Sequence, residues 1–413
     1  MKKSLFALAA VTAFAGAAQA QSSVTVYGIL DVGYIGSNTT ARSSAVTTNG
    51  GQTKTTFSQL GQNAEQTNRL GFKGSEDLGG GKQAVFTVEF YLYPQDQVVS
   101  GNTAGGLQNR QSFAGLHQNG VGAATVGLQY TPIFNAAAAT SAAQLNNMLG
   151  DAVYSAGTVT AGTNGSGAPT NSFTNRVANA LVLQSDAFSG LRGNLTLTQN
   201  NSNTSQVNVS STTQTGGNTN ASGWGLGLDY TWNKLYVTAA YQALKQLTTA
   251  SDLGAVTTTN TVPWTGAQPS VTASGSAVAS NGLNIQDNQT YVGATYDFGI
   301  LKAYGQYASR KATSTISSDF YVKRSAEQIG VRSFVTPTIE VWGQAGLGRY
   351  TSFGSGTPTS NFNTYQLGSN YWLSKRTNLY AIYGQQNYST FAVGTTTYSS
   401  NANNYALGMR HTF

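Results

Sequence analysis

The last ten residues of the chain alternate strictly between two kinds of side chain. Every second position of this stretch holds an aromatic, long apolar or imidazole group, in the order Tyr405, Leu407, Met409, His411 and Phe413. Strand side chains point to opposite faces with a period of two, so this pattern predicts a strand with one largely apolar face. The closing strand of a transmembrane β-barrel gives both faces a partner, with Phe413 toward lipid and Arg410 toward a wet interior. The alternative is an edge strand of a soluble sheet.

The same alternation recurs along the chain, between segments rich in Gly, Asn and Ser. Residues 24–32 form a first strand with Asp31 facing inward, and residues 69–74 a second with Arg69 and Lys73 inward. Thirteen further segments can be added to these two and to residues 84–93, near 108–118, 122–130, 174–185, 189–200, 221–232, 234–246, 287–298, 300–310, 322–335, 338–350, 362–373, 376–389 and 402–413. Short links alternate with long ones, which is typical of an outer-membrane barrel. The pattern therefore predicts an all-β, sixteen-stranded antiparallel transmembrane barrel.

Composition excludes several other classes of protein. Only 9% of the residues are charged, against about 25% in soluble domains, and 11% are aromatic, which argues against disorder. The absence of Cys excludes disulfides and thiol-ligated metal sites. Residues 1–20 have the basic start, short apolar stretch and small-residue cleavage site of a signal peptide. We expect its removal, leaving residues 21–413 as a single barrel domain.

The longest link of interest covers residues 131–173. It is rich in Ala, Gly and Ser, and its single acid is Asp151. Such a segment has few solvating side chains, so we expect it to fold into the lumen and narrow it. Residues 37–67 and 201–220 are polar and are assigned to segments outside the strands.

Aromatic residues mark many of the expected strand ends. They are Tyr91, Tyr93, Tyr130, Trp232, Tyr236, Tyr296, Phe298, Tyr371, Trp372 and Tyr380. Aromatic girdles at the two membrane interfaces would place side chains in these positions. Packing against neighbouring side chains is the alternative for any one of them.

Several stretches resemble the general porins of Gram-negative outer membranes, and most closely the beta-proteobacterial subgroup. They are Val-Thr-Val-Tyr-Gly-Ile-Leu-Asp-Val-Gly at 24–33, Asn-Arg-Leu-Gly-Phe-Lys-Gly-Ser-Glu-Asp-Leu-Gly-Gly-Gly at 68–81, Asn-Arg-Gln-Ser-Phe-Ala-Gly-Leu at 109–116, Val-Gly-Leu-Gln-Tyr-Thr-Pro at 126–132 and Asn-Arg-Val-Ala-Asn-Ala at 175–180. The resemblance extends from the signal peptide to Phe413, although the long links match poorly. The acidic Pro-Glu-Phe-Gly type of sequence that is common in the constriction loops of such porins is missing here.

The resemblance implies a homotrimer in the outer membrane, in contact with lipid and lipopolysaccharide. It also implies an inward-folded third external loop facing basic residues on the opposite wall, which here are Arg69, Arg110 and Arg176. Phe413, with Tyr405 on the same strand, would close the barrel and be recognised by the barrel-assembly machinery. The function implied is passive diffusion of small hydrophilic solutes and ions through a water-filled channel.

Strand parity bears on the charge of this channel. Arg69 and Arg176 alternate with apolar residues and point inward, as does Arg192, whereas the parity of Arg110 is ambiguous. Several arginines around a narrow pore concentrate anions. With Asp151 as the single loop acid, we predict anion preference, which Glu89 and Asp31 would partly neutralise.

Other functions find little support in the sequence. The two histidines, His117 and His411, lie in strand patterns with no carboxylate pair spaced around them. Residues 79–83 and 223–227 lack the spacing of phosphate and dinucleotide loops, and no basic run predicts nucleic-acid binding. We therefore expect no enzyme activity, cofactor or metal. A substrate-specific anion channel with a saturable site, or a non-conducting adhesin or structural barrel, remain the alternatives.

Overall fold

The computed structural model describes residues 23–45, 47–96, 99–100, 106–154, 172–210, 213–249, 285–314, 321–353, 359–393 and 395–413. The expected signal peptide therefore lies outside the described residues, as do residues 155–171 of the link at 131–173. The strands are β1 (Ser23–Ser43), β2 (Gln52–Gln62), β3 (Arg69–Gly79), β4 (Lys82–Tyr91), β5 (Asn109–Gln118), β6 (Gly122–Tyr130), β7 (Arg176–Ser185), β8 (Leu191–Ser210), β9 (Thr213–Trp232), β10 (Leu235–Thr249), β11 (Ile285–Asp297), β12 (Lys302–Ser314), β13 (Tyr321–Phe334), β14 (Ile339–Phe353), β15 (Thr359–Trp372), β16 (Thr377–Val393) and β17 (Thr396–Thr412). A 3-10 turn, η1 (Thr48–Gly51), precedes β2, and one helix, α2 (Pro132–Thr140), follows β6.

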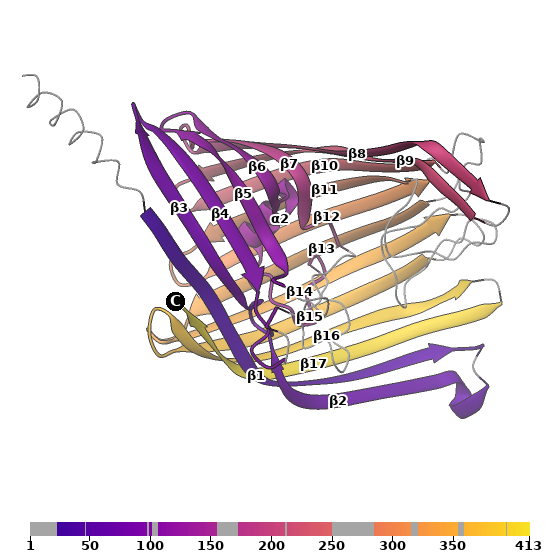
Figure 1. Ribbon diagram of the computed structural model, residues 1–413. Helices are drawn as coiled ribbons and strands as arrows, with labels where there is room; N and C mark the ends of the chain where they lie inside the picture. Colours follow the sequence, from indigo (N-terminus) through magenta and orange to yellow (C-terminus); the bar gives the residue numbers. More distant parts are fainter. Residues whose placement is uncertain are drawn as a thin grey trace, which may run out of the picture.

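The strands form one closed antiparallel barrel (Figure 1). Each strand pairs with the next along the chain, except that β2 and β3 both pair with β1, and β1 also pairs with β17. β2 and β3 lie end to end along β1, opposite residues 32–42 and 23–29. β2 and β3 therefore count as one strand that is interrupted at residues 63–68. With these two counted as one, the seventeen strand segments give a barrel of sixteen strands. The predicted sixteen-stranded antiparallel barrel is confirmed.

The end of the chain closes this barrel. The backbone amide of Phe413 donates to the Gly28 carbonyl, and the Gly28 amide donates to the Phe413 carbonyl, both at 3.1 Å. A side chain on Gly28 would collide with the Phe413 ring, so glycine at this position makes room for that aromatic group. Phe413 is 40% exposed, on the same outer face as Tyr405. Closure in this way gives both β1 and β17 a partner strand on each side.

Two polar segments assigned outside the strands are in fact largely strand. β1 continues to Ser43 and pairs there with β2, while β8 and β9 continue their ladder to Ser210 and Thr213. Both faces of such an extension meet polar surroundings beyond the bilayer, so neither face selects apolar residues and the alternation disappears. The assignment of residues 37–67 and 201–220 was wrong for this physical reason.

The outer face and the lumen are packed differently. Large apolar side chains are exposed on the outer face, among them Val26, Leu226, Ile329 and Leu367. The buried apolar core lies between the inner wall and residues 131–154. Figure 1 shows α2 inside the barrel. Of the helices that the structure describes, none is long and apolar enough to cross a membrane.

Candidate functional site

The link after β6 turns into the barrel. The Thr131 hydroxyl caps α2 by accepting from the Phe134 amide at 3.3 Å, and Pro132 occupies the first turn, where its missing amide costs nothing. The helix packs against the inner faces of β9, β10, β11 and β12. Residues 141–154 continue along the inside of the barrel toward β13–β17. We call the inner face of β9–β17 the loop-holding wall.

Glycines on the loop-holding wall lie directly against residues 140–152 of the loop. A side chain on Gly293, Gly330, Gly346 or Gly384 would meet Thr140, Ala142, Ala152 and the Leu149 carbonyl respectively. These glycines lie on the inner faces of β11, β13, β14 and β16. The missing side chains let the loop backbone approach the strands closely, which is one of the uses of glycine within a sheet.

Side-chain amides of the same wall hydrogen-bond to the loop backbone. Gln328 and Gln344 accept from the amides of Ala152 at 2.7 Å and Ala143 at 3.2 Å. Further contacts bring Gln366 Nε2 within 2.7 Å of the Leu149 carbonyl, Asn404 Oδ1 within 3.1 Å of the Leu149 amide, and Arg332 Nη1 within 2.6 Å of the Ala142 carbonyl. Buried backbone groups need such partners, so these contacts fix the path of the loop.

Three arginines face this loop from the other side of the lumen. Arg69 begins β3, Arg110 lies near the start of β5, and Arg176 begins β7. We call these three residues the basic wall. The guanidinium of Arg110 lies 4.5 Å from the centre of the Tyr91 ring, and that of Arg176 lies 5.5 Å from the centres of both Tyr91 and Tyr130. Stacking of this kind holds long side chains in place without removing their charge.

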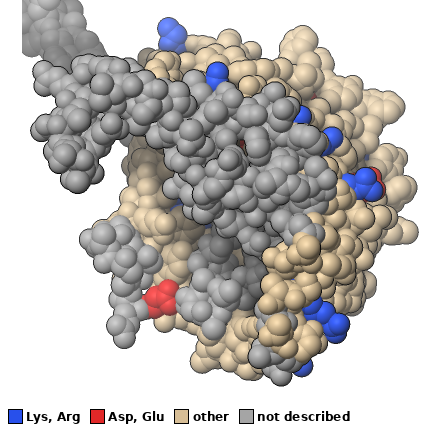
Figure 2. Space-filling view, turned by 90° about the vertical axis from the view of Figure 1, so that its right-hand side faces the viewer, with Lys and Arg blue, Asp and Glu red and all other residues tan. Residues whose placement is uncertain are grey.

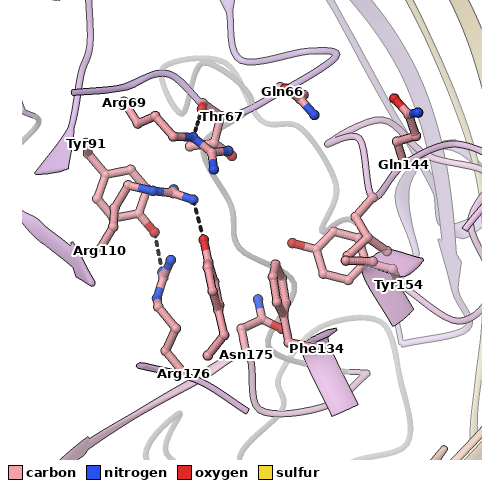
Figure 3. Close-up of a pocket in the computed structure, with 13 residues that line it drawn as sticks. Gln66, Thr67, Arg69, Tyr91, Arg110, Phe134, Gln144, Tyr154, Asn175 and Arg176 are labelled. Carbon is pink, nitrogen blue, oxygen red and sulfur yellow. Dashed lines mark hydrogen bonds between the residues drawn. The ribbon is translucent and has the colours of Figure 1, made fainter. Parts of the chain in front are cut away.

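Hydrogen bonds to phenol oxygens fix the same groups. Arg110 Nη2 donates to the Tyr130 hydroxyl at 2.9 Å, and Arg176 Nη2 donates to the Tyr91 hydroxyl at 2.5 Å (Figure 3). Arg69 Nε donates to the Thr67 carbonyl at 3.0 Å. The arginines are therefore held by neutral partners at these positions, and their positive charges are retained.

One carboxylate lies among these cations. Glu89 Oε1 is 2.7 Å from Arg110 Nε, and Glu89 Oε2 is 3.9 Å from Arg69 Nη1. The Tyr27 hydroxyl also donates to Glu89 at 3.1 Å, and Glu89 is 2% exposed. Three positive groups against one negative group leave the cluster with a net charge of +2.

Irregular pairing helps to aim two of these arginines. Glu89 pairs with Gln111 and Phe90 pairs with Asn109, so Arg110 is an extra residue between two ladder positions. A second irregularity lies in β7, where Asn179 has a φ of 51°, three residues after Arg176. β-Bulges re-aim side chains next to functional sites. The ambiguous parity of Arg110 in the sequence has its cause here.

A cavity of about 190 Å³ separates the basic wall from the loop (Figure 3). The loop side is formed by uncharged residues, which are Phe134, Ala138, Gln144, Leu145 and Tyr154. None of the described residues that line the cavity is acidic. Asp151 does not line it, because this buried carboxylate accepts from the backbone amides of Val153 and Tyr154 at 2.9 and 2.7 Å. The cavity thus lies between positive charge on one side and a neutral surface on the other.

A family model described as Gram-negative porin matches residues 7–390. The chain belongs to this family. An outer membrane porin protein of Bordetella pertussis is 37% identical over 133 residues, which are 31% of this chain and 34% of that protein. Outer membrane porin protein 32 of Delftia acidovorans is 40% identical over 121 residues, or 29% of each chain. The matched stretch spans about a third of the length of these curated relatives.

A solved structure supports the fold of this porin over 95% of its length. An anion-selective porin from Comamonas acidovorans superimposes with a TM-score of 0.62, at 21% identity, over 95% of this chain and 100% of that one. The resemblance inferred from the sequence is confirmed, and the relatives are channels rather than enzymes. This porin is a protein of the Gram-negative outer membrane.

Two of the predicted basic residues of the porin lie away from the cavity. Lys73 is on the inner face of β3, four residues nearer the short turns, where its ammonium lies 5.5 Å from the Tyr27 ring centre. Arg192 is exposed in the second position of β8, beside the short link from β7. Neither residue lines the cavity. The structure brings together Arg69, Arg110 and Arg176 only.

Asp31 and Arg410 of the porin do point inward, but they are buried rather than wet. Asp31 Oδ2 accepts from the amides of Glu65 and Gln66 at 2.7 and 2.6 Å, and Asp31 Oδ1 accepts from the Tyr380 hydroxyl at 2.6 Å. Arg410 Nε lies 3.5 Å from Glu65. These two residues hold the interruption between β2 and β3 against the wall, so the expected wet surroundings of Arg410 were wrong.

Some aromatic residues were wrongly assigned to the membrane girdles of the porin. Tyr91 and Tyr130 hold the basic wall, and Tyr380 binds Asp31 inside the barrel. Tyr236 and Trp372 also point inward, to Asp229 and Glu340. The sequence did hold a signal for Tyr91: it lies two residues from the inward-facing Glu89 and therefore on the same, inner face of β4. Trp232, Tyr296, Phe298 and Tyr371 are exposed on the outer face.

No metal centre can be built from the described part of this porin. Its residues contain no group of three or more His, Cys, Asp or Glu side chains that could hold an ion. The His117 ring instead lies 3.0 Å from Asp186, in the short link between β7 and β8.

Proposed function

We propose that this porin forms a water-filled channel through which small hydrophilic solutes and ions cross the outer membrane passively, with anions preferred. The observation that carries the proposal is the asymmetry of the cavity, with three guanidinium groups on one side and uncharged residues on the other. A preformed positive surface at a narrow passage lowers the energy of an anion there and raises that of a cation. The anion-selective porin from Comamonas acidovorans has the same fold.

The magnitude of the preference follows from Coulomb's law. A unit charge about 5 Å from a passing ion acts across water with about 0.8 kcal/mol, which is about a fourfold change in local concentration. Removal of two of the three arginines should therefore lower the local anion concentration by about 16-fold, and the anion-to-cation permeability ratio by that factor or more, because the repulsion of cations is lost as well. Glu89 moderates the effect, because it is bonded to Arg110 and approaches Arg69.

The deciding experiment is the reversal potential of the purified protein in planar bilayers under a KCl gradient. The Arg69→Ala/Arg176→Ala variant is compared with Lys73→Ala/Arg192→Ala, which removes two inward cations outside the cavity. We expect an anion-sided potential in the wild type that falls in the first variant and persists in the second. If the anion-sided reversal potential fell equally in both variants, the basic wall would not be the source of the selectivity. If the protein did not conduct, the channel function itself would be wrong.

The same cavity supports a second candidate, a saturable anion site. Two of its arginines hold tyrosine hydroxyls while their charges face a space of about 190 Å³. Saturation of anion flux at millimolar concentration, lost in the Arg69→Ala/Arg176→Ala variant, would favour this substrate-specific channel over free diffusion.

We also propose that the porin assembles as a homotrimer and that Phe413 addresses it to the barrel-assembly machinery. The exposed ring of Phe413, fixed by paired backbone bonds to Gly28, is in a position to be recognised from outside the barrel. Cross-linking of the purified protein checks the trimer. Deletion of Phe413 should lower the amount of folded protein in the outer membrane.

A further inference from the structure

The two sides of the cavity differ in kind as well as in charge. The basic wall offers guanidinium groups, whereas the loop side offers rings and aliphatic carbon from Phe134, Leu145 and Tyr154. A small inorganic anion gains from the guanidiniums but has no apolar surface to place against the loop. The cavity therefore matches a solute with a negative charge at one end and apolar surface at the other.

Three aromatic rings form a row from the basic wall to the loop. Tyr130 and Phe134 are stacked, with ring centres 4.0 Å apart and planes inclined by 8°. Phe134 meets Tyr154 edge to face, with ring centres 6.4 Å apart and planes at 70°. Aromatic pairs add stability beyond the area that they bury, so these rings support one another. We call Tyr130, Phe134 and Tyr154 the ring row, which brings aromatic surface up to the guanidiniums.

The backbone beneath this row is fixed. Phe134 lies in the first turn of α2, where its amide donates to the capping hydroxyl of Thr131. The Tyr154 amide donates to the Asp151 carboxylate at 2.7 Å. Tyr154 is buried, whereas Phe134 is only partly buried and lines the cavity. A ring that is already held in place loses little freedom when a solute packs on it.

Arg176 is the least compensated cation of the basic wall. Arg69 and Arg110 share Glu89, whereas no acid of the described residues lies within 4.0 Å of Arg176. Arg176 Nη2 donates to the Tyr91 hydroxyl, and its Nε and Nη1 donate to no described residue. A guanidinium with open donors suits a carboxylate, which it can bind through two parallel hydrogen bonds.

A hydroxyl group on the loop faces the same space. Figure 3 shows the Tyr154 hydroxyl pointing from the loop toward the basic wall. It has no hydrogen-bond partner in the part of the chain that the structure describes. A phenol O–H donates readily to a carboxylate. A carboxylate in the cavity can therefore receive donors from both sides.

The approach to the cavity favours anions but does not choose among them. Figure 2 looks onto the end that bears the long links and shows Lys and Arg around the rim, with little acid among the described residues. Such charge attracts every anion, over a distance that the salt concentration sets. The choice between one anion and another therefore depends on short-range contacts in the cavity.

We infer that this cavity is a subsite for small aromatic carboxylates, of which benzoate is the simplest. The carboxylate lies against Arg176, and the ring packs against Phe134 and Leu145. Sites for drug-sized ligands measure about 300–1,000 Å³, so a cavity of about 190 Å³ suits a single ring. The inference rests on the anion-preferring channel proposed above and names the class of solute that its saturable site takes.

The first test is equilibrium binding to the full-length protein in detergent micelles at neutral pH, measured by ligand-detected NMR. The probes are benzoate, cyclohexanecarboxylate and acetate, which share the carboxylate and differ in the attached group. Burial of roughly 60 Å² of apolar surface strengthens binding by about tenfold, so benzoate should bind about tenfold more tightly than acetate. Cyclohexanecarboxylate should bind about threefold more weakly than benzoate, because it lacks contacts between aromatic rings. Equal affinities for benzoate and acetate would overturn the subsite, and equal affinities for the two ring acids would overturn the aromatic class.

Two variants locate the subsite. Phe134→Ala removes the central ring of the ring row and should weaken benzoate binding by about tenfold, while acetate binding changes by less than about twofold. Phe298→Ala removes a ring that is 57% exposed on the outer face and should leave the binding of both acids unaltered. Equal losses for benzoate and acetate in Phe134→Ala would overturn the subsite, as would unaltered benzoate binding.

Phe134→Leu separates loss of the ring from loss of packing. Leucine keeps apolar volume beside Tyr130, so this variant should retain cyclohexanecarboxylate binding and bind benzoate about threefold more weakly. The reversal potential under a KCl gradient should match the wild type in both Phe134 variants, because every charge remains. A shift toward cations would show that Phe134 acts by holding Tyr130 and Arg110, and would overturn the subsite.

Conductance separates this inference from the proposed function. Benzoate should lower the chloride current of the wild type, with a half-effect near its dissociation constant, and should do so much less in Phe134→Ala. A protein that binds benzoate selectively but does not conduct with anion preference would overturn the channel and support the subsite. An anion-preferring channel that binds benzoate no better than acetate would support the channel and overturn the subsite.

Discussion

Both sides of the lumen carry arginines of low exposure, but they differ in how far acids balance the charge beside the cavity. On the loop-holding wall, Arg332 pairs with Glu340 through two nitrogens, and Arg310 pairs with Asp287. Arg324 on β13 donates to the Tyr350 hydroxyl and the Ala152 carbonyl and does not line the cavity. On the basic wall, Arg69, Arg110 and Arg176 share the single acid Glu89. A count of arginines over the barrel would therefore misjudge selectivity. What decides it is the charge that remains beside the passage after local pairing.

The two sides also differ in what their polar groups hold. The amides and guanidiniums of the loop-holding wall bind backbone groups of residues 142–152 and keep them in place. The polar partners of the basic wall are tyrosine hydroxyls and Glu89, which fix the arginines themselves. One side thus positions the constriction and the other supplies its charge, so variants on the two sides should have different consequences.

The largest effect on the stability of the fold should come from Arg332→Met. This change leaves the Glu340 carboxylate buried without its cation and removes the bond to the Ala142 carbonyl. Loss of one partner of a buried pair costs about 3–5 kcal/mol, so the unfolding midpoint in urea should fall markedly.

The double variant Arg332→Met/Glu340→Leu is the control for this experiment. Replacement of both partners by apolar groups is often neutral or stabilising, so most of the lost stability should return. If the double variant were as unstable as the single one, the loop contact rather than the ion pair would be the main contribution of Arg332.

A smaller loss of stability is expected from Gly384→Ala, which tests the contact between the wall glycines and the loop. The new methyl group would collide with the Leu149 carbonyl, so the loop or the strand must move, at a cost of about 1–3 kcal/mol. Single-channel conductance should change together with the urea midpoint, because residues 144–145 of the same loop line the cavity.

Gly305→Ala is the matched change on β12, where the added methyl group meets open space. It should be neutral or stabilise by up to about 1 kcal/mol, since alanine loses less backbone entropy than glycine. Equal behaviour of the two variants would contradict the seating of the loop by Gly384.

The selectivity of the basic wall should sharpen in Glu89→Gln. The net charge of the cluster rises from +2 to +3, and one charge acting at about 7 Å through water contributes about 0.6 kcal/mol, which is about threefold in local anion concentration and about threefold or more in permeability ratio. Reversal potentials measure the change. Glu327→Gln removes an acid from the lipid face and should leave the ratio unaltered, so a shift of equal size there would point to a general effect of protein charge.

The sequence predicted most of the barrel because lipid and water select opposite faces of each strand. Leu70 and Phe72 on one face and Arg69 on the other were enough to orient β3, and the structure agrees. The same logic fails where both faces are wet, and for that reason the ends of β1, β8 and β9 were missed. It also falters at bulges, which change the face of a residue within a strand.

The basic wall was found through the family resemblance more than through pattern. Arg110 is an inserted residue at a bulge, so counting by twos could not place it. Tyr91 and Tyr130 were missed because an aromatic residue at a strand end suits either a membrane girdle or an inner contact. The inner role depends on contacts between strands β4, β5, β6 and β7, which no single segment reveals. The amide contacts of residues 142–152 likewise join parts of the chain far apart in sequence.

The smallest effect on stability should come from the contacts between short links at one end of the barrel, beside the strands of the basic wall. Asp186, in the link between β7 and β8, lies 3.0 Å from the His117 ring and accepts from the Gly120 amide at 2.8 Å. These bonds, that from His117 first, lower the pKa of Asp186 from its ordinary value of 3.8. They tie two adjacent links together at the surface, whereas the loop-holding wall is fastened by buried pairs.

A depressed pKa gives this tie a defined dependence on pH. A carboxylate whose folded pKa lies below its unfolded value contributes stability above the unfolded pKa and loses it as pH falls through the folded one. Asp186→Asn should therefore melt slightly below the wild type at neutral pH, with the difference shrinking below about pH 4. Thermal melts at several pH values measure it. If the difference in melting temperature stayed constant into acid, the hydrogen bond from the Gly120 amide, and not the carboxylate charge, would make the contribution. The two walls would then not differ in their response to acid.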